Sequence, residues 1–493
     1  MLDQLKKHPL LLVIITFFLR VFHVESKSTQ IHLCVFALAI YALNTCKSVR
    51  FMFLHFIHLV VKFKLKSFYY TFSESKVDIE AWSKSLVNIA LNLLPIDKTL
   101  PILFIIDDTL IEKFGEFFEA VATLHDHAAH NGANYLFGHC LVCLAMLIPV
   151  KCNGEVKYIR FPVAFKMWIP ENNNNKENTE SKANKKNKKK RQSKYKQKGE
   201  TKKANCETQN SQYKTKLRIA FDLLELAYSQ VDPSQQVVLL ADSWYPKGEV
   251  LDFIKKHDNV EAVLSVKKNT VFYDCVIERT GKPGRPRTKG VKLNNDQDFQ
   301  LTDVVDSDYR VGFRTVTTNL FGHDKEVMAM VTESRESNSR RYFVCTNPQA
   351  CSLPVELITD EKVKAIAKTV PAVQWFATYA LRWAIETTFL EQKAYWGLCD
   401  YMLRSVHGIE TLVNLQSIAY AALALIPWLD PKFACLQDQS IQERRYEVGR
   451  LVDRQVFLAN FGRKLETDEN SKELAEAIKE HRLKEGFDFK IAS

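Results

Sequence analysis

The chain has 493 residues, of which 46% are apolar and 25% are charged, and this composition excludes a largely disordered protein. The net charge of +11 is not spread over the chain, because residues 171–216 carry 15 Lys or Arg against 5 Glu and the remainder is close to neutral. The charge therefore marks one basic tract and excludes a basic fold, and the length accommodates two or three domains of roughly 150 residues each.

The N-terminal part is rich in apolar runs. Lys6 and Lys7 precede PLLLVIITFFL, as in a signal peptide, but Arg20 and Glu25 follow where a small-residue cleavage site is needed. The next apolar run, residues 31–43, is too short to span a membrane. The pattern predicts a bundle of buried helices over residues 1–95, and a membrane anchor within residues 9–63 is the alternative.

A core of strands and helices is predicted next. The apolar run ILFII ends at Asp107, and residues 136–150 and 155–165 read as two further strands around the turn signal Asn153-Gly154. After the basic tract come a helix from Lys216, a strand that ends at Asp242, a helix at 247–257 and a strand at 261–266. The order is three antiparallel strands, helix, strand, helix, strand.

The basic tract 171–216 has almost no apolar residue, so we predict that it is disordered and that its phosphate contacts are non-specific. The eleven Cys have no repeating spacing, which is typical of a reducing cytoplasm. Cys140 and Cys143 form a CxxC in an apolar setting and are interpreted as core residues, with zinc as the alternative.

The remaining chain returns from strands to helices. Short β segments broken by Gly, Pro and Asn fill residues 270–360, a long helix is predicted at about 372–394, and further helices follow around 408–428. The predicted regions are a helical region (1–95), the first part of an α/β core (96–269), a β-rich insertion subdomain (270–360), the second part of the core (361–430) and a C-terminal helical region (431–493).

Three carboxylates stand out by their positions. Asp107 and Asp242 each follow a buried strand, where side chains of neighbouring strands converge at one sheet edge, and Glu386 lies on the later helix. Clustered carboxylates need a counter-charge, which Mg²⁺ supplies through hard oxygen ligands. Asp108 competes with Asp107, and Glu391 with Glu386. The ordinary alternative is that the Asp residues are turn or cap residues.

The predicted long helix places four functional side chains on one face. Tyr379, Arg382, Glu386 and Lys393 have offsets of 0, 3, 7 and 14, which fall within about 60° of arc at about 100° per residue. One acid among two cations and a phenol suits a metal-bearing carboxylate beside an anionic polymer. A solvated face with Arg–Glu pairing is the alternative.

This spacing, Tyr-x2-Arg-x3-Glu-x6-Lys, resembles the signature of the insertion-sequence-four type of DDE transposases, and FIIDDT and LLADSWY are similar to that family's two Asp segments. The resemblance covers roughly residues 100–430. It implies an α/β fold, a ribonuclease H-like mixed sheet flanked by helices, with a β-rich insertion between the second Asp and the Glu. It favours Asp107 over Asp108, because Asp107 and Thr109 match the family's Asp-x-Thr.

The resemblance also implies roles and partners. Asp107, Asp242 and Glu386 are expected to be catalytic and to bind two Mg²⁺ ions, for which Mn²⁺ can substitute, while Tyr379, Arg382 and Lys393 hold phosphates of the element ends. The expected activity is cleavage at the ends of a bacterial insertion sequence and strand transfer to target DNA, by a cytoplasmic, nucleoid-associated homodimer with no membrane partner. A ribonuclease H-like nuclease without strand transfer and an inactive DNA-binding derivative are the alternatives.

Other residues are candidates for DNA contact. Arg285 and Arg287 lie in GKPGRPRTKG, whose GRP centre resembles minor-groove-binding hooks, and Lys267 and Lys268 follow a predicted strand. A solvated loop is the alternative in both cases. Trp375 and Phe321 are candidates for stacking on a flipped base, although a core role is the simpler interpretation.

Overall fold

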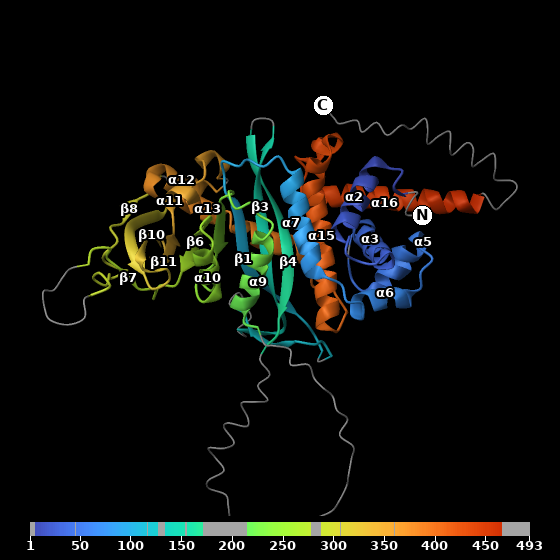
Figure 1. Ribbon diagram of the computed structural model, residues 1–493, viewed down its shortest axis with the longest axis horizontal. Helices are drawn as coiled ribbons and strands as arrows, with labels where there is room; N and C mark the ends of the chain where they lie inside the picture. Colours follow the sequence, from blue (N-terminus) through green and yellow to red (C-terminus); the bar gives the residue numbers. More distant parts are fainter. Residues whose placement is uncertain are drawn as a thin grey trace, which may run out of the picture.

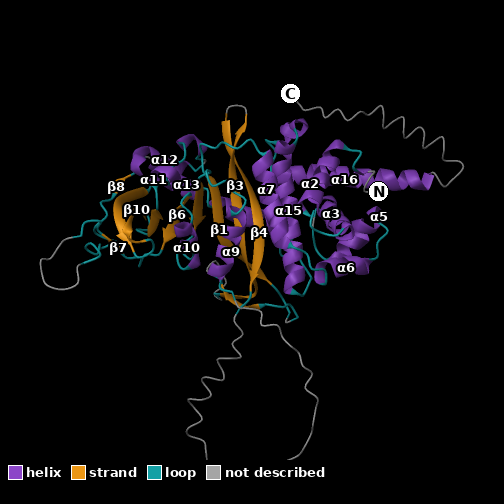
Figure 2. Ribbon diagram, in the orientation of Figure 1, coloured by secondary structure: helices purple, strands orange, loops and turns teal. Residues whose placement is uncertain are grey.

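The computed structural model describes residues 5–465 apart from 45, 116, 127–133, 153–154, 171–213, 278–286, 306 and 359. A mixed β-sheet runs through the middle of the molecule (Figures 1 and 2). The N-terminal helices cover one end of the molecule, and a group of later strands with short helices forms the other. The basic tract lies outside the described residues except for Lys214, Thr215 and Lys216.

The centre of the sheet is built from the predicted strands, which follow one another along the chain in the predicted order. Strands β4, β3, β1, β5 and β6 lie side by side in that order, with β3 antiparallel to β1 and β4, and with β5 and β6 parallel to β1. Their bounds are β1 (Ile102–Glu112), β3 (Tyr135–Cys152), β4 (Glu155–Trp168), β5 (Val237–Ala241) and β6 (Val260–Val266). The short β2 (Ala122–His125) also pairs with β3 and was not predicted. Every residue of β5 is buried, as expected for an apolar strand covered on both faces.

The predicted β-rich segment continues this sheet. β11 pairs antiparallel with β6, and β10, β9 and β7 extend the sheet beyond it. The bounds are β7 (Phe272–Tyr273), β8 (Thr302–Asp303), β9 (Tyr309–Thr318), β10 (Gly322–Ser334) and β11 (Arg340–Cys345). The mixed sheet with flanking helices is the predicted α/β, ribonuclease H-like fold.

Helices connect and cover the central strands. α9 (Lys216–Tyr228) lies between β4 and β5 in the chain and packs on β3 and β4, whereas α10 (Glu249–Lys256) connects β5 to β6. α14 (Trp383–Tyr395) packs on β1 and β4, and α15 (Val406–Leu429) packs along β4. These contacts bring α14, which carries Glu386, against β1, the strand that carries Asp107.

The N-terminal helices form the predicted buried bundle around α15 and α16. The elements are α2 (Pro9–Val21), α3 (Lys27–Ala42), α4 (Val49–Met52), η1 (Phe53–Ile57), α5 (His58–Val60), α6 (Leu65–Ser73), α7 (Ile79–Leu93) and α16 (Ile441–Leu465). Side chains cap several of them; Ser26, for example, accepts from the Thr29 amide at 3.2 Å. Within the described residues, α15 alone has the length and hydropathy of a membrane span, and it is mostly buried among these helices and β4, as a core helix is.

The predicted helix at 372–394 is two helices. α13 (Phe376–Ala380) and α14 are separated at Leu381 and Arg382, where the amides bond to carbonyls three residues back instead of four. This tighter turn of about three residues still places Tyr379 and Arg382 on the same side. The remaining short elements are α11 (Pro348–Cys351), η4 (Val355–Leu357), α12 (Glu361–Thr369), η5 (Pro371–Val373) and η6 (Pro431–Leu436).

Candidate active site

The two aspartates are brought together by the parallel pairing of β1 and β5. The last pair in the register is Ile106 with Ala241, so Asp107 and Asp242 are the next residues on two adjacent strands. The prediction that the first strand ends at Asp107 is wrong, because β1 runs on to Glu112 through its antiparallel pairing with β3. Asp107 is therefore held rigidly inside a strand, while Asp242 begins the loop after β5.

The turn after β5 orients Asp242. Its Oδ1 accepts the backbone N–H of Trp244 at 3.0 Å, and its carbonyl accepts the N–H of Tyr245. Such an Asx turn fixes the carboxylate relative to its own backbone.

Arg382 links Glu386 to Asp107. One guanidinium nitrogen of Arg382, Nη1, is 2.8 Å from Asp107 Oδ2 and 3.3 Å from Glu386 Oε1. The three side chains come from β1, from the turn between α13 and α14, and from the first turn of α14. The structure thus brings together residues that lie 275 positions apart in the chain.

Burial and mutual repulsion make this group of carboxylates electrostatically unfavourable. Burial and the nearby charges of Asp242 and Glu386 together raise the pKa of Asp107 to about 8, against the opposing charge of Arg382. Burial also raises the pKa of Asp242, against hydrogen bonds from its own turn and the charge of Arg382. Additional positive charge would stabilise the ionised carboxylates of such a site.

The donor chemistry fits a hard divalent cation, since carboxylate oxygens are the ligands that Mg²⁺ takes in proteins. Among the described residues, however, no three His, Cys, Asp or Glu side chains lie close enough to hold a metal ion as they stand. The guanidinium of Arg382 lies against two of the three carboxylates. Asp107, Asp242 and Glu386 would therefore hold a metal only when Arg382 gives up those contacts.

Asp108 is engaged elsewhere and does not compete with Asp107. Its Oδ1 accepts the hydroxyl of Tyr245 at 2.9 Å, and its Oδ2 accepts from Lys216 Nζ at 2.8 Å and from Cys140 Sγ at 3.1 Å. Adjacent residues of a strand point to opposite faces, so Asp108 faces away from the partners of Asp107. The geometry favours Asp107 as the functional carboxylate.

Glu391 is also accounted for. Its carboxylate pairs with Arg160 on β4 at 2.5 Å and accepts the hydroxyl of Tyr420 on α15. These contacts bind α14 to its neighbours. Among the described residues, Arg382 is the only ion-pair partner of Glu386. Because Glu391 is used by the fold and Glu386 is not, Glu386 is favoured as the functional acid.

Tyr379 and Lys393 lie beside the site with different surroundings. Burial raises the pKa of Tyr379, whose ring stacks on Phe376 at 6.2 Å between centroids. Lys393 donates to the Leu110 carbonyl of β1 at 2.9 Å, so part of its donor capacity already serves the fold. Tyr379 contacts Phe343 on β11 and Lys393 contacts β1, and the role of both in DNA binding stays a prediction.

The other predicted DNA contacts differ in position. Lys267 follows β6 and is exposed. The pKa of Lys247 is lowered first by burial and then by the nearby charge of Lys267. Arg287 is exposed, and Arg285 lies outside the described residues. Lys268 is exposed and lies 3.9 Å from Asp296.

The two candidate stacking aromatics are core residues. Trp375 has no exposed surface, and Phe321 is 5% exposed, which agrees with the simpler interpretation of both. Trp383, next to Arg382 on α14, is 66% exposed. The sequence interpretation missed it because a helical Trp between Arg and Ala carries no local sign of exposure.

Sequence reasoning also missed three residues around Asp242. Trp244 and Tyr245 were present in the LLADSWY segment, and Lys216 was counted only as part of the basic tract. Lys216 instead begins α9, and its ammonium is 5.4 Å from the ring centres of both Trp168 and Trp244. Only the contact between distant segments reveals these roles.

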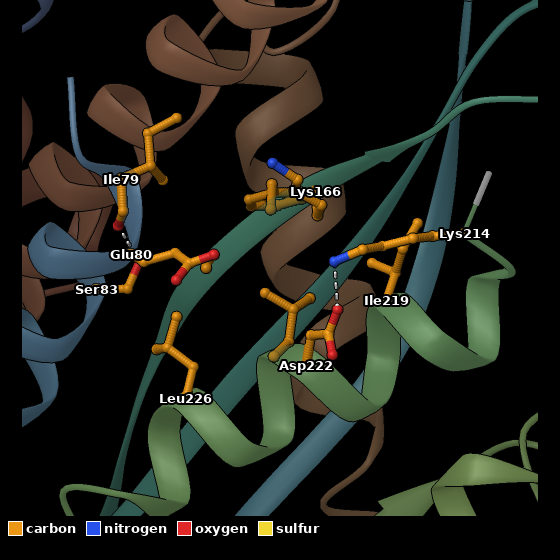
Figure 3. A pocket seen from close by; sticks show the side chains of 11 residues that line it. Ile79, Glu80, Ser83, Lys166, Lys214, Ile219, Asp222 and Leu226 are labelled. Atoms are coloured by element: carbon orange, nitrogen blue, oxygen red, sulfur yellow. Dashed lines mark hydrogen bonds and ion pairs between the residues drawn. The ribbon is translucent and has the colours of Figure 1, made fainter. Parts of the chain in front are cut away.

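Two hollows in the described part of the chain lie away from the carboxylates. A cavity of about 60 Å³ between α7, β4 and α9 is lined by residues that include Glu80, Lys166 and the Lys214–Asp222 ion pair (Figure 3). A second hollow of about 480 Å³ is lined by residues including Asp97, near the start of β1. Neither of these two hollows is lined by Asp107, Asp242 or Glu386.

The family model described as DDE superfamily endonuclease matches residues 24–321, more than half of the chain. The matched span includes Asp107 and Asp242 and ends before Glu386. No curated protein matches the chain.

Proposed function

Because the chain belongs to the DDE superfamily endonucleases, we propose that it is a transposase of the insertion-sequence-four type that cuts and joins DNA at the ends of a bacterial insertion sequence. The observation that carries the proposal is the contact of Arg382 with both Asp107 and Glu386, with Asp242 on the neighbouring strand close enough to raise the pKa of Asp107. The Tyr-x2-Arg-x3-Glu-x6-Lys spacing supports the transposase assignment. The predicted domain boundaries, cytoplasmic location and homodimer belong to the same proposal.

Members of this family are metal-dependent nucleases, and bound divalent ions, two Mg²⁺ in this proposal, would activate a nucleophile and stabilise the leaving oxygen of a phosphodiester. Asp107, Asp242 and Glu386 are the residues that would hold them. Asp107 contributes a position fixed by strand pairing, and the Asx turn after β5 orients Asp242. Ionisation of Asp107 is the proton loss that prepares the site.

Arg382 has a second task in this proposal. In the absence of DNA it neutralises Asp107 and Glu386, and its planar guanidinium is well suited to bidentate contact with a phosphate. Tyr379, Lys393, Lys267 and Arg287 would complete the contacts with duplex DNA. Release of the carboxylates by Arg382 would then accompany the arrival of a DNA strand.

The decisive experiment replaces the third carboxylate. We expect Glu386→Gln to abolish DNA cutting while DNA affinity falls no more than about twofold, because it removes a metal ligand and leaves the cations in place. Glu361→Gln, an exposed acid on α12, is the matched control and should cut normally. Cutting by Glu386→Gln at the wild-type rate would contradict the assignment.

Strand transfer separates the proposal from its closest alternative. Purified protein, Mg²⁺, labelled element-end duplex and a target plasmid should yield labelled plasmid through attack of a 3′-hydroxyl. Cleavage without joined product would favour a nuclease, and no change of any activity in Asp242→Ala would favour a non-catalytic DNA-binding derivative. The element ends can be identified as short inverted repeats in the DNA that flanks the gene.

A further inference from the structure

Lys247 lies near Asp242 and, among the described residues, forms no ion pair. It is exposed, five residues after Asp242, with its ammonium 4.0 Å from the centre of the Trp244 ring. In the described chain no ion pair joins Lys247 or Lys267 to a carboxylate, whereas the nearby Lys256 pairs with Glu225 at 2.9 Å. Its positive charge is therefore available to a ligand.

Trp244 serves as a support for this lysine. The ammonium groups of Lys247 and Lys216 both lie over the Trp244 ring, that of Lys216 at 5.4 Å from the ring centre. The ring of Tyr245 packs against it edge-on, with 5.0 Å between the ring centres. Cations placed over an indole are attracted by its electron-rich face. With these contacts in place, the ring positions Lys247, and its face is not free to stack on a nucleobase.

Lys247 and Lys267 come to the same edge from neighbouring strands. β5 and β6 are parallel, so the residues that follow Ala241 and Val266 lie at one end of the sheet. Burial lowers the pKa of Lys247 and the charge of Lys267 lowers it further, while Asp242 opposes both effects. The two ammonium groups repel each other, and an anion between them would relieve this repulsion.

We propose that Lys247, held on the face of Trp244, acts with Lys267 to bind a backbone phosphate of the DNA strand adjacent to the phosphodiester that is cut. This inference rests on the proposed function and deepens it. Arg382 lies against Asp107 and Glu386, whereas Lys247 and Lys267 lie on the Asp242 side. The strand is thereby held on both sides of the carboxylates.

The test measures the salt dependence of DNA binding. Full-length wild type, Lys247→Gln, Lys247→Arg and the control Lys255→Gln are titrated into a fluorescein-labelled duplex of arbitrary sequence, in EDTA, over a series of NaCl concentrations. Lys255 is an exposed lysine on α10, so its substitution removes the same charge from a nearby surface. We expect the slope of log affinity against log salt to fall by about 0.9 in Lys247→Gln and to be unchanged in the other two variants.

The competing explanation is that Lys247 only balances the charge of Asp242. In that case Lys247→Gln would keep the wild-type salt slope and change the Mg²⁺ concentration needed for cutting, and the inference would be overturned. A reduced slope in Lys255→Gln equal to that of Lys247→Gln would overturn it as well. If wild type itself neither binds nor cuts DNA, the proposed function fails; if wild type does both and Lys247→Gln binds identically, only the inference fails.

Discussion

Arg382 is the residue on which the charge of the site depends. Its side chain is 13% exposed and contacts Asp107 and Glu386. Among the described residues, it is the only cation that forms an ion pair with either acid. A partly buried ion pair whose cation is removed leaves its carboxylates uncompensated. The sequence predicted this residue as a phosphate contact, but its pairing with Asp107 required the fold.

We expect Arg382→Ala to have two opposite effects. Affinity for duplex DNA should fall, with the salt slope reduced by about 0.9, because a phosphate contact is lost. Affinity for Mg²⁺, measured by calorimetry in the absence of DNA, should rise because the competing guanidinium is gone. Unchanged Mg²⁺ affinity would indicate that Arg382 does not occupy the cation position.

The buried carboxylate makes stability depend on pH. The pKa of Asp107 is raised to about 8 by burial and by Asp242, while an unfolded Asp titrates near about 3.9. The unfolded chain therefore loses this proton first, and the stability that the protonated form provides is lost as pH rises from about 4 through about 8.

It follows that Asp107→Asn should melt at a higher temperature than wild type in metal-free buffer. The difference should be close to zero near pH 4 and largest above pH 8, because the amide does not ionise. Thermal unfolding followed by circular dichroism over this range checks the sign. A difference that is largest at low pH would contradict the assigned shift.

At the scale of elements, the turn after β5 is tied to β1 by one hydrogen bond. The buried Tyr245 donates to Asp108, the neighbour of Asp107, so the segment that carries Asp242 cannot move independently of the strand that carries Asp107. Pairing of β1 with β5 ends just before both acids, and this bond extends the attachment beyond the sheet.

Tyr245→Phe should consequently affect catalysis more than DNA binding. It removes a hydrogen bond to a carboxylate, which costs about 1.5–3 kcal/mol, and loosens the distance between the two aspartates. We expect the turnover number for cutting to fall about tenfold or more with little change in KM. Loss of DNA affinity in proportion to activity would point instead to general misfolding.

The order of the core elements could be predicted because each strand is a continuous apolar run and each helix has a regular apolar repeat. Two features could not be predicted in this way. β1 continues past Asp107 only because β3 pairs with that part of it, and the turn between α13 and α14 is fixed where Arg382 reaches across to β1. The three acids could be proposed from local sequence, whereas the contacts of Asp108 with Tyr245, Lys216 and Cys140 join segments far apart in the chain.

At the scale of the whole molecule, one sheet links the carboxylates to the β-rich segment. β6 lies next to β5 and also pairs with β11, so strands added between Asp242 and Glu386 share hydrogen bonds with the strands that carry the site. The N-terminal helices have a separate task, since they enclose α15, which packs on β4 and would otherwise expose a long apolar surface.

The place where the basic tract joins the core also has an evolutionary consequence. Trp168, the last residue of β4, and Lys216, the first of α9, lie against each other, with the lysine ammonium 5.4 Å from the ring centre. Chain inserted between two anchored ends adds only a logarithmic entropy cost, about 0.6 kcal/mol for each doubling of length. We therefore expect that relatives of this protein can differ in chain length at this point without moving the strands that carry the carboxylates.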